Sequence, residues 1–387
     1  MQVIVMDLMG TVAYYNVELC RALKRTNVNV TLATPASCLD PQYSATDGIQ
    51  RLSGMTDRVA KVLGPPSVRR ILKLGEYITN LCVCIYHIAR WRPDALHVQF
   101  LPLATYYGLP IEYWFLKIVR ACRIPIIYTV HNVLPHDTGN ARASVFRRIY
   151  SAADLLICHN QTAQEELVRD FGIDAERVRV IPHGPLLPGH DAARVSHART
   201  ALGIPDNECV VLWQGHVKPY KGVPFLLDAW NIVHRQRANA TLFIVGSGDS
   251  QLYLEFEQQV EQLGIASSVR LVCRFMGVRE LAEYYEAADI IVYPYRDITT
   301  SGALMTGLNY KKPIIVTDLP AFRELMNPVD PTVIIQYGDR QSLASAIIRL
   351  IDDPARRIQL GAKQAELLPC WTEIGAQTLA AYEIVAR

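Results

Sequence analysis

Two lysines in the second half of the chain have the residue type and spacing of a diphosphate site. Lys218 and Lys221 lie in one tight loop after the apolar run 210–213, between Gly215 and Gly222. Ammonium groups attract phosphate oxygens, and glycines let backbone N–H groups approach them. A solvent-exposed position is the more frequent explanation for either lysine alone. The pair, placed between a strand and a helix, favours a diphosphate site.

A second loop suited to an anion follows the apolar run 290–293. Ser301 and Gly302 begin a short helix that the pattern predicts as far as Tyr310. The first amides of a helix have no acceptor within the helix, so they can donate to an anion. An ordinary helix cap is the alternative. The lysine loop earlier in the chain favours the anion site.

These loops must be positioned by the alternating strand-like and helix-like segments that run through the whole chain. Continuous apolar strands between helices predict parallel sheets covered on both faces, with ligands beyond the carboxyl ends of the strands. A chain of 387 residues exceeds what one core usually organises. The sequence therefore predicts an α/β protein of two doubly wound domains, residues 1–187 and 199–372, joined by an aperiodic linker over 188–198.

In the first half, the candidates for binding are the polar residues that follow strands. A histidine at the end of a strand more often has a structural role than a catalytic one. Three such positions are candidates for the acceptor side: Thr11 and Tyr14 after the first strand, beside Gly10; His97 and Gln99 after the third long strand; and Asn132, beside His131, after the fourth.

The segment from Leu63 to Trp91 interleaves basic and apolar residues at helical spacing, with Arg69, Arg70 and Lys73 near its start. One interpretation is a surface helix that packs its apolar stripe on the domain. The other is a peripheral contact with an anionic membrane, which would give access to a lipid-linked acceptor.

Composition limits the class of protein further. The formal net charge is +2, so no global field indicates nucleic acid as a partner. The nine cysteines mostly lie in apolar runs, which predicts reduced thiols in a cytoplasmic protein. Cys82 and Cys84 lack zinc-ligand spacing, so we expect no metal. We also expect no secretion signal and no membrane-spanning segment.

Five motifs in order resemble the GT-B glycosyltransferases of family 4, the group 1 glycosyl transferases. The motifs are Ile181–Gly184, Gly215–Gly222, Val245–Gly248, the loop and helix from Ser301 to Pro313, and Cys370–Ile374. The resemblance implies two Rossmann-like domains that face each other across a cleft, with a terminal helix, 373–387, packed back on the first domain.

The same resemblance implies transfer of a sugar from a nucleoside diphosphate sugar to a glycan, glycolipid or lipid-linked acceptor, in polysaccharide or glycoconjugate synthesis. It implies retention of configuration by front-face attack, with no cofactor and no metal, because Lys218 and Lys221 would supply the positive charge. Such an enzyme would work in the cytoplasm, and the basic segment would bring it to the inner face of the cell membrane.

Carried over residue by residue, the resemblance assigns roles to several positions. His131 would lie against the donor sugar, and Arg274 and Phe275 would lie at the nucleotide base. The expected donor-binding residues are Gly10, Gly215, Lys218, Lys221, Gly246, Arg274, Phe275, Thr299, Thr300, Ser301, Gly302 and Thr306, and the expected catalytic residues are His131, Lys218, Lys221 and Asp297.

The chain departs from the family at its two glutamates, whose positions are occupied here by Ile298 and Thr306. Asp297 lies beside the first position, and the departure predicts a divergent subgroup in which Thr299, Thr300 and Ser301 replace part of the carboxylate function. Two alternatives stay open. Turnover of a nucleotide sugar without acceptor would indicate a 2-epimerase of the same fold, and binding without any turnover would indicate an inactive nucleotide-sugar binder.

Overall fold

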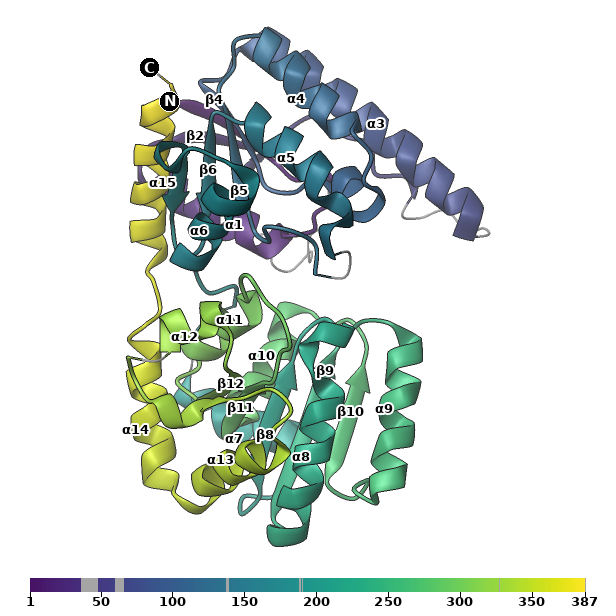
Figure 1. The fold of residues 1–387 in the computed structure, drawn as a ribbon, viewed down its shortest axis with the longest axis vertical. Helices are drawn as coiled ribbons and strands as arrows, with labels where there is room; N and C mark the ends of the chain where they lie inside the picture. Colours follow the sequence, from purple (N-terminus) through teal and green to yellow (C-terminus); the bar gives the residue numbers. More distant parts are fainter. Residues whose placement is uncertain are drawn as a thin grey trace. The chain divides into compact units, whose positions relative to one another are not determined.

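The computed structural model describes residues 1–35, 48–59, 66–136, 139–187, 189, 191–326 and 328–386. The chain forms two compact units, which are shown in Figure 1. Unit 1 comprises Met1–His183 and Pro369–Arg387, and unit 2 comprises Gly184–Leu368.

Unit 1 is built on a seven-stranded sheet in the order β3-β2-β1-β4-β5-β6-β7, and every strand pairing in it is parallel. The central strands are buried on both faces, which explains their continuous apolar sequences. The strands are β1 (Gln2–Met6), β2 (Asn29–Ala33), β3 (Gln50–Arg51), β4 (Ala95–Val98), β5 (Ile126–Val130), β6 (Leu155–Cys158) and β7 (Val178–Val180).

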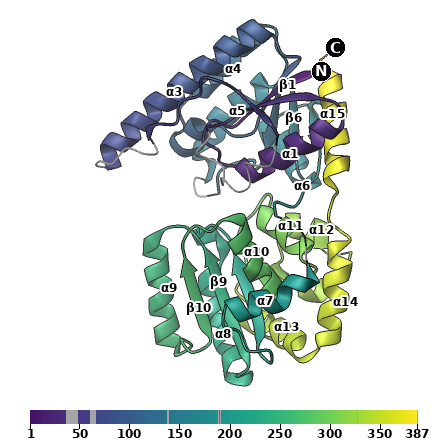
Figure 2. The same ribbon diagram turned by 180° about the vertical axis from the view of Figure 1, so that it is seen from behind.

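Helices cover both faces of this sheet (Figures 1 and 2). They are α1 (Ala13–Arg25), α3 (Pro66–Trp91), α4 (Ile111–Ala121), α5 (Ala143–Ala152), α6 (Gln161–Phe171) and α15 (Trp371–Val385), with one π-helical turn, η3 (Leu103–Tyr107), and the 3-10 turns η4 (Gly139–Arg142) and η5 (Ala175–Arg177). The terminal helix α15 packs on α1, where a Cβ added to Gly375 would lie 3.0 Å from the backbone of Ala22.

Unit 2 repeats this architecture with a six-stranded parallel sheet in the order β10-β9-β8-β11-β12-β13. Its strands are β8 (Cys209–Gln214), β9 (Ala240–Gly246), β10 (Val269–Cys273), β11 (Ile290–Tyr293), β12 (Ile314–Thr317) and β13 (Ile334–Ile335). Its helices are α7 (Ala192–Ala201), α8 (Val223–Gln236), α9 (Ser250–Leu263), α10 (Val278–Ala287), α11 (Gly302–Asn309), α12 (Pro320–Met326), α13 (Arg340–Asp352) and α14 (Pro354–Ala365), with the 3-10 turns η6 (Pro219–Lys221) and η7 (Pro331–Val333).

The order of strands reverses direction at one place in each sheet, between β1 and β4 in unit 1 and between β8 and β11 in unit 2. In doubly wound sheets, ligands bind at the carboxyl ends of the strands beside this reversal. The predicted fold class of two doubly wound Rossmann-like domains is confirmed, and each unit offers one such position.

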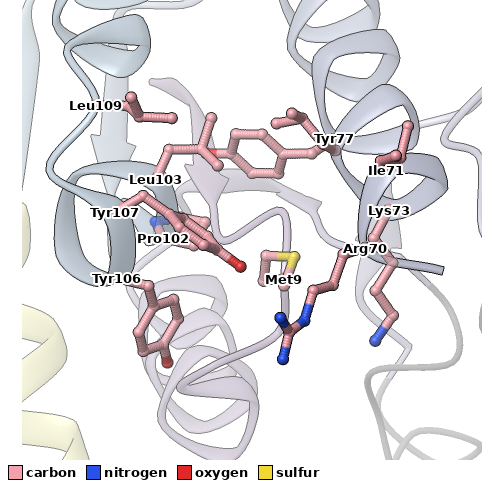
Figure 3. A pocket seen from close by; sticks show the side chains of 11 residues that line it. Met9, Arg70, Ile71, Lys73, Tyr77, Pro102, Leu103, Tyr106, Tyr107 and Leu109 are labelled. Atoms are coloured by element: carbon pink, nitrogen blue, oxygen red, sulfur yellow. The ribbon is translucent and has the colours of Figure 1, made fainter. Parts of the chain in front are cut away.

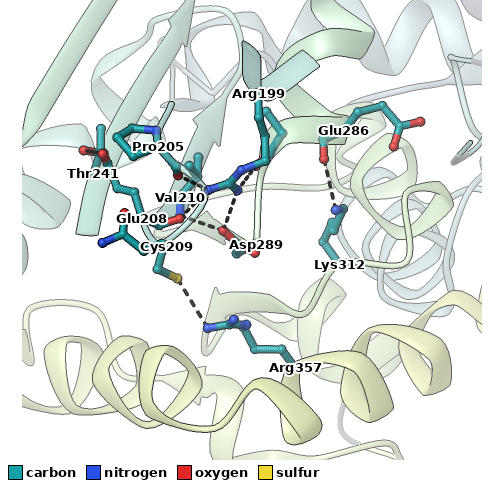
Figure 4. A network of polar contacts seen from close by, with 12 residues as sticks. Arg199, Pro205, Glu208, Cys209, Val210, Thr241, Glu286, Asp289, Lys312 and Arg357 are labelled. Atoms are coloured by element: carbon teal, nitrogen blue, oxygen red, sulfur yellow. Dashed lines mark hydrogen bonds and ion pairs between the residues drawn. The ribbon is translucent and has the colours of Figure 1, made fainter. Parts of the chain in front are cut away.

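The segment 188–198, expected to be a linker, is instead largely occupied by α7 (Pro188 and His190 lie outside the described residues). Ala and Arg are strong helix formers, and they outweigh the Pro and Gly residues that precede them. Arg199 anchors this helix to unit 2: its guanidinium contacts the Asp289 carboxylate at 3.2 Å and donates to the carbonyl of Pro205 at 2.9 Å (Figure 4). Asp289 also accepts the N–H of Val210, at the start of β8.

We predict that Arg199→Ala lowers the free energy of unfolding of unit 2 by about 2 kcal/mol, because hydrogen bonds from a charged, partly buried group are lost. Arg194→Ala on the same helix is the matched control. Arg194 pairs with Asp191 with 64% of its side chain exposed, and such pairs contribute little. Urea unfolding followed by tryptophan fluorescence measures both variants, and equal effects would contradict the anchoring role.

Candidate functional site

The loops after β8 and β11 meet at the reversal of strand order in unit 2. Their strands are neighbours in register, with Ile290 opposite Val211. The backbone N–H of Arg296 donates to the carbonyl of Tyr220 at 2.7 Å. Gly222 has a φ of +72°, and a Cβ at this position would lie 1.8 Å from the carbonyl oxygen of Pro294. Only glycine permits this approach, so the two loops form one surface.

Lys221 is buried where these loops meet. Its ammonium donates to the hydroxyl of Tyr295 at 3.0 Å and lies 4.2 Å from the centroid of that ring. Burial lowers the pKa of Lys221 to about 7. The Tyr295 hydroxyl also hydrogen-bonds the side chain of Ser301. Burial raises the pKa of the Tyr295 phenol, and the hydrogen bond with Ser301 lowers it by a smaller amount. Lys221, Tyr295 and Ser301 therefore form one connected group.

Ser301 also caps helix α11, because its Oγ accepts the N–H of Leu304 at 3.1 Å. Gly302 is the first residue of the helix and is partly exposed. The amides at such a terminus attract anions. The structure thus brings a buried lysine and a helix N-terminus to the same pair of loops.

The loop after β9 packs against the loop that carries Lys218. Gly246 has a φ of +151°, and a Cβ there would lie 1.9 Å from the carbonyl oxygen of Gly215. The N–H of Val217 donates to the carbonyl of Ser247 at 2.8 Å. Lys218 is partly exposed in the turn that follows. Gly215 and Gly246 therefore fix the backbone from which both lysines extend.

The residues expected at the sugar and the base lie in different environments. Asp297 is exposed, Thr299 is partly exposed, and Thr300 has a buried Oγ1 with no hydrogen-bond partner among the described residues. Arg274 and Phe275 follow the edge strand β10. Arg274 pairs with Glu280 at 2.8 Å, and Phe275 has 69% of its surface exposed.

Thr306 is enclosed within its own helix. It is 3% exposed, and its hydroxyl donates to the carbonyl of Gly302 at 2.8 Å, within its own helix. A hydroxyl used in this way inside a helix has no free hydrogen for a ribose. Thr306 is therefore expected to contact the donor poorly, and its place among the donor-binding residues stays a prediction.

In unit 1, the structure gathers His131, His159 and His183 around Tyr15. The ring centroid of Tyr15 lies 4.9 Å from those of His131 and His183, and the ring centroid of His159 lies 5.1 Å from each of these two histidines. Trp371, at the start of α15, completes the cluster at 5.4 Å from Tyr15. His159 directly follows β6 and His183 lies three residues after β7, but neither was among the residues predicted for the site.

Two acceptor-side candidates, His97 and Gln99, are buried and lie within the protein's own hydrogen-bond network. His97 belongs to β4, and its ring nitrogens lie 2.7 Å from the hydroxyls of Tyr382 and Thr129. Gln99 contacts both His97, at 3.0 Å, and His131, at 3.1 Å. Both side chains are therefore held by neighbouring side chains, and their assignment to the acceptor side stays a prediction.

Burial lowers the pKa of His97 to about 3 and that of His159 to about 4, and it holds the pKa of His131 well below its usual value. The rings are therefore neutral. His159 Nδ1 lies 2.9 Å from the carbonyl of Ile181 and must donate to it, so His159 Nε2 accepts from His131 Nδ1 at 3.2 Å. Neutral His131 then carries its one hydrogen on Nδ1, so its Nε2, which lies 3.1 Å from Gln99 Oε1, has no hydrogen to donate.

The remaining candidates follow the carboxyl ends of β1 and β5, in loops or, for Tyr14, in the first turn of α1. Gly10 has a φ of +62°, Thr11 is exposed, and Tyr14 is partly exposed. The buried carboxylate of Asp7 holds the loop by accepting the N–H of Val12 at 2.9 Å. The Asn132 side-chain oxygen lies 3.0 Å from a ring nitrogen of His136.

Across the ranges that the model describes, no cluster of three His, Cys, Asp or Glu side chains is placed to hold a metal ion. In the same ranges, no helix is both long and apolar enough to span a bilayer.

Two family models match the chain. Residues 12–184 match the family 4 glycosyltransferases, and residues 208–353 match the group 1 glycosyl transferases. The chain belongs to the family 4 glycosyltransferases. The D-inositol 3-phosphate glycosyltransferase of Xylanimonas cellulosilytica is 25% identical, with 96% of this chain and 91% of the relative covered. A second enzyme of that name, from Catenulispora acidiphila, is 26% identical, with 96% and 90% covered.

Solved structures agree on the fold of this glycosyltransferase. Anabaena HepE in complex with UDP and glucose superposes with a TM-score of 0.76 at 16% identity, covering 99% of this chain and all of HepE. Sucrose-phosphate synthase from Thermosynechococcus elongatus superposes with a TM-score of 0.73 at 21% identity, covering 99% and 98%.

The pKa of Lys221 gives a pH prediction for nucleotide binding. Below pH 7 the side chain of Lys221 is already charged. Above pH 7, a bound diphosphate must raise the pKa of Lys221, and the lysine takes up one proton from solution on binding. The affinity for UDP or GDP should therefore fall by up to about tenfold per pH unit above pH 7, with proton uptake. Calorimetry in buffers of different ionisation enthalpy measures both quantities. Lys221→Met should abolish the proton uptake, and an unchanged uptake in that variant would contradict the assignment.

Proposed function

We propose that this glycosyltransferase moves a hexosyl group from a nucleoside diphosphate sugar to a hydroxyl of a glycan, glycolipid or lipid-linked acceptor. The observation that carries the proposal is the buried ammonium of Lys221, hydrogen-bonded to Tyr295 beside the N-terminus of α11. A buried cation needs a counter-charge, and the reversal of strand order is where such a fold binds its ligand. The diphosphate of the donor supplies that charge.

In the proposed reaction, the bond from the sugar to the leaving diphosphate breaks while the sugar becomes oxocarbenium-like. Lys221, Lys218 and the amides at Gly302 stabilise the negative charge that develops on the diphosphate, and stabilisation of developing charge is what accelerates a reaction. These groups make a metal unnecessary. Ile298 and Thr306 occupy the positions of the family's glutamates, and neither is a nucleophile.

We further propose that configuration is retained by front-face attack, with the leaving phosphate taking the proton of the acceptor. This route needs no general base from the protein. Asp297, Thr299 and Thr300 are proposed to contact the sugar hydroxyls, and Phe275 and Arg274 the base.

The names of similar proteins suggest which substrates to test first. HepE has been solved with UDP and with UDP-glucose, which supports a uridine nucleotide as the first donor. The relatives named D-inositol 3-phosphate glycosyltransferase add a phosphorylated polyol to the acceptors worth testing. We propose a place in polysaccharide or glycoconjugate synthesis, in the cytoplasm at the inner face of the membrane.

Release of nucleoside diphosphate across a panel of donors and acceptors tests the proposal. Lys221→Ala should lower transfer at least about tenfold, the loss expected for one charge-assisted contact. Lys363→Ala is the control, since Lys363 is exposed on α14, away from both loops. Near-normal transfer by Lys221→Ala would reject the diphosphate assignment.

The same panel separates the two alternatives. Conversion of the nucleotide sugar without any acceptor would identify an epimerase. Tight binding of nucleotide sugar with no release of nucleoside diphosphate over the whole panel would identify an inactive binder.

A further inference from the structure

Unit 1 contains a pocket at its own reversal of strand order, separate from the histidine cluster. The pocket has a volume of about 250 Å³ and is lined by side chains from three segments (Figure 3). Met9 comes from the loop after β1, Leu103 and Tyr106 come from η3 after β4, and Ile71 and Tyr77 come from α3. The pocket therefore lies at the position where a doubly wound sheet binds its ligand.

The wall of this pocket is held by a buried carboxylate. Glu112 accepts the N–H groups of Leu103 and Ala104 at 2.9 and 2.6 Å and the hydroxyl of Tyr77 at 2.6 Å. It thereby ties the π-helical turn to α3. Such turns recur at functional sites. The carboxylate points into the protein, where it accepts these three hydrogen bonds, and it is not exposed in the pocket. The surface of the pocket therefore consists mainly of carbon atoms.

Charge at the pocket has one sign. Arg70 and Lys73 lie on the side of the pocket formed by α3, and Figure 3 shows the guanidinium of Arg70 beside Met9. Among the described residues that line the pocket, none is acidic. A ligand that fits this distribution has an apolar part for the interior and an anionic group for the rim.

The surface around the pocket is unusually apolar. Ile71 is 71% exposed, and Trp114, on the neighbouring helix α4, is 61% exposed. Val68, Leu72 and Tyr107 are also exposed. α3 runs along the outside of unit 1 in both views (Figures 1 and 2), and its first turns carry Val68, Ile71 and Leu72 among basic residues. The helix is therefore not packed along its whole apolar face, and this mixture suits the headgroup region of a membrane.

We propose that the pocket binds the hydrocarbon chain of a lipid whose phosphate group lies against Arg70 and Lys73, and that this lipid carries the acceptor hydroxyl. The inference rests on the proposed function and narrows its acceptor to the lipid-linked class. The loop that contributes Met9 continues directly into Gly10 and Thr11, so the pocket and the candidate acceptor loop are adjacent along the chain.

Calorimetric titration with alkyl phosphates of increasing chain length, below their micelle concentrations and without nucleotide, tests the site directly. Each methylene that enters the pocket should tighten binding roughly fourfold until the pocket is full, after which the affinity should level off. Inorganic phosphate should bind weakly. Affinities that do not depend on chain length would overturn the proposal and leave only a phosphate contact.

Two variants with matched controls locate the binding. Ile71→Asp should remove most of the dependence on chain length, whereas Ile358→Asp, at an isoleucine of unit 2 that is 73% exposed, should not. The double variant Arg70→Glu, Lys73→Glu should lower the affinity for every alkyl phosphate at least about tenfold. The control double variant Arg169→Glu, Lys363→Glu should leave these affinities unchanged. Circular dichroism checks folding, and both isoleucine positions are exposed enough to accept aspartate. Equal behaviour of variant and control would overturn the proposal.

The outcome is separable from that of the proposed function. Donor binding, measured with UDP or GDP, should be unchanged in Ile71→Asp. If alkyl phosphates bind as expected but no transfer occurs with any donor, the lipid site stands and the transferase proposal fails. If transfer to soluble acceptors occurs and chain length has no effect, the lipid site fails alone.

Discussion

The buried ammonium of Lys221 is the constraint on which the candidate donor site depends. A cation removed from water is costly unless neighbours compensate it. Here the hydroxyl and ring of Tyr295 compensate only in part, because burial still lowers the pKa of the lysine to about 7. The lysine can reach this position because β8 and β11 are neighbours and Gly222 lets their loops touch. An anion bound there would restore the charge that burial disfavours.

The two units use the same topology for different chemistry. In unit 2, the loops at the strand reversal present a lysine and a helix terminus, which suit a diphosphate. In unit 1, the equivalent position has an apolar pocket with basic residues on one side, and three histidines cluster near neighbouring strand ends. A sheet of this kind sets where a ligand binds, whereas the loop residues decide what it is.

Much of the fold follows from the sequence, because parallel strands buried on both faces must be continuously apolar. The loops after them could be found for the same reason, and Lys221 and Ser301 lie close together as expected of neighbouring strand ends.

The environment of His97 could not be predicted in this way. Its partner Tyr382 is 285 residues away in the sequence, and no local pattern reports such a contact. For Thr306, the sequence could not show that the hydroxyl would bond the backbone of its own helix. The α7 helix was missed because flanking Pro and Gly residues hid a short segment of strong helix formers.

The central claim is that a nucleoside diphosphate binds where the loops after β8 and β11 meet. A crystal structure of the protein with an intact nucleoside diphosphate sugar tests it most directly. The account predicts phosphate oxygens within hydrogen-bonding distance of Lys221 Nζ and of the amide of Gly302, with Thr306 still bonded to its own helix. Phosphates bound away from Lys221, or a ribose bonded to Thr306, would contradict it.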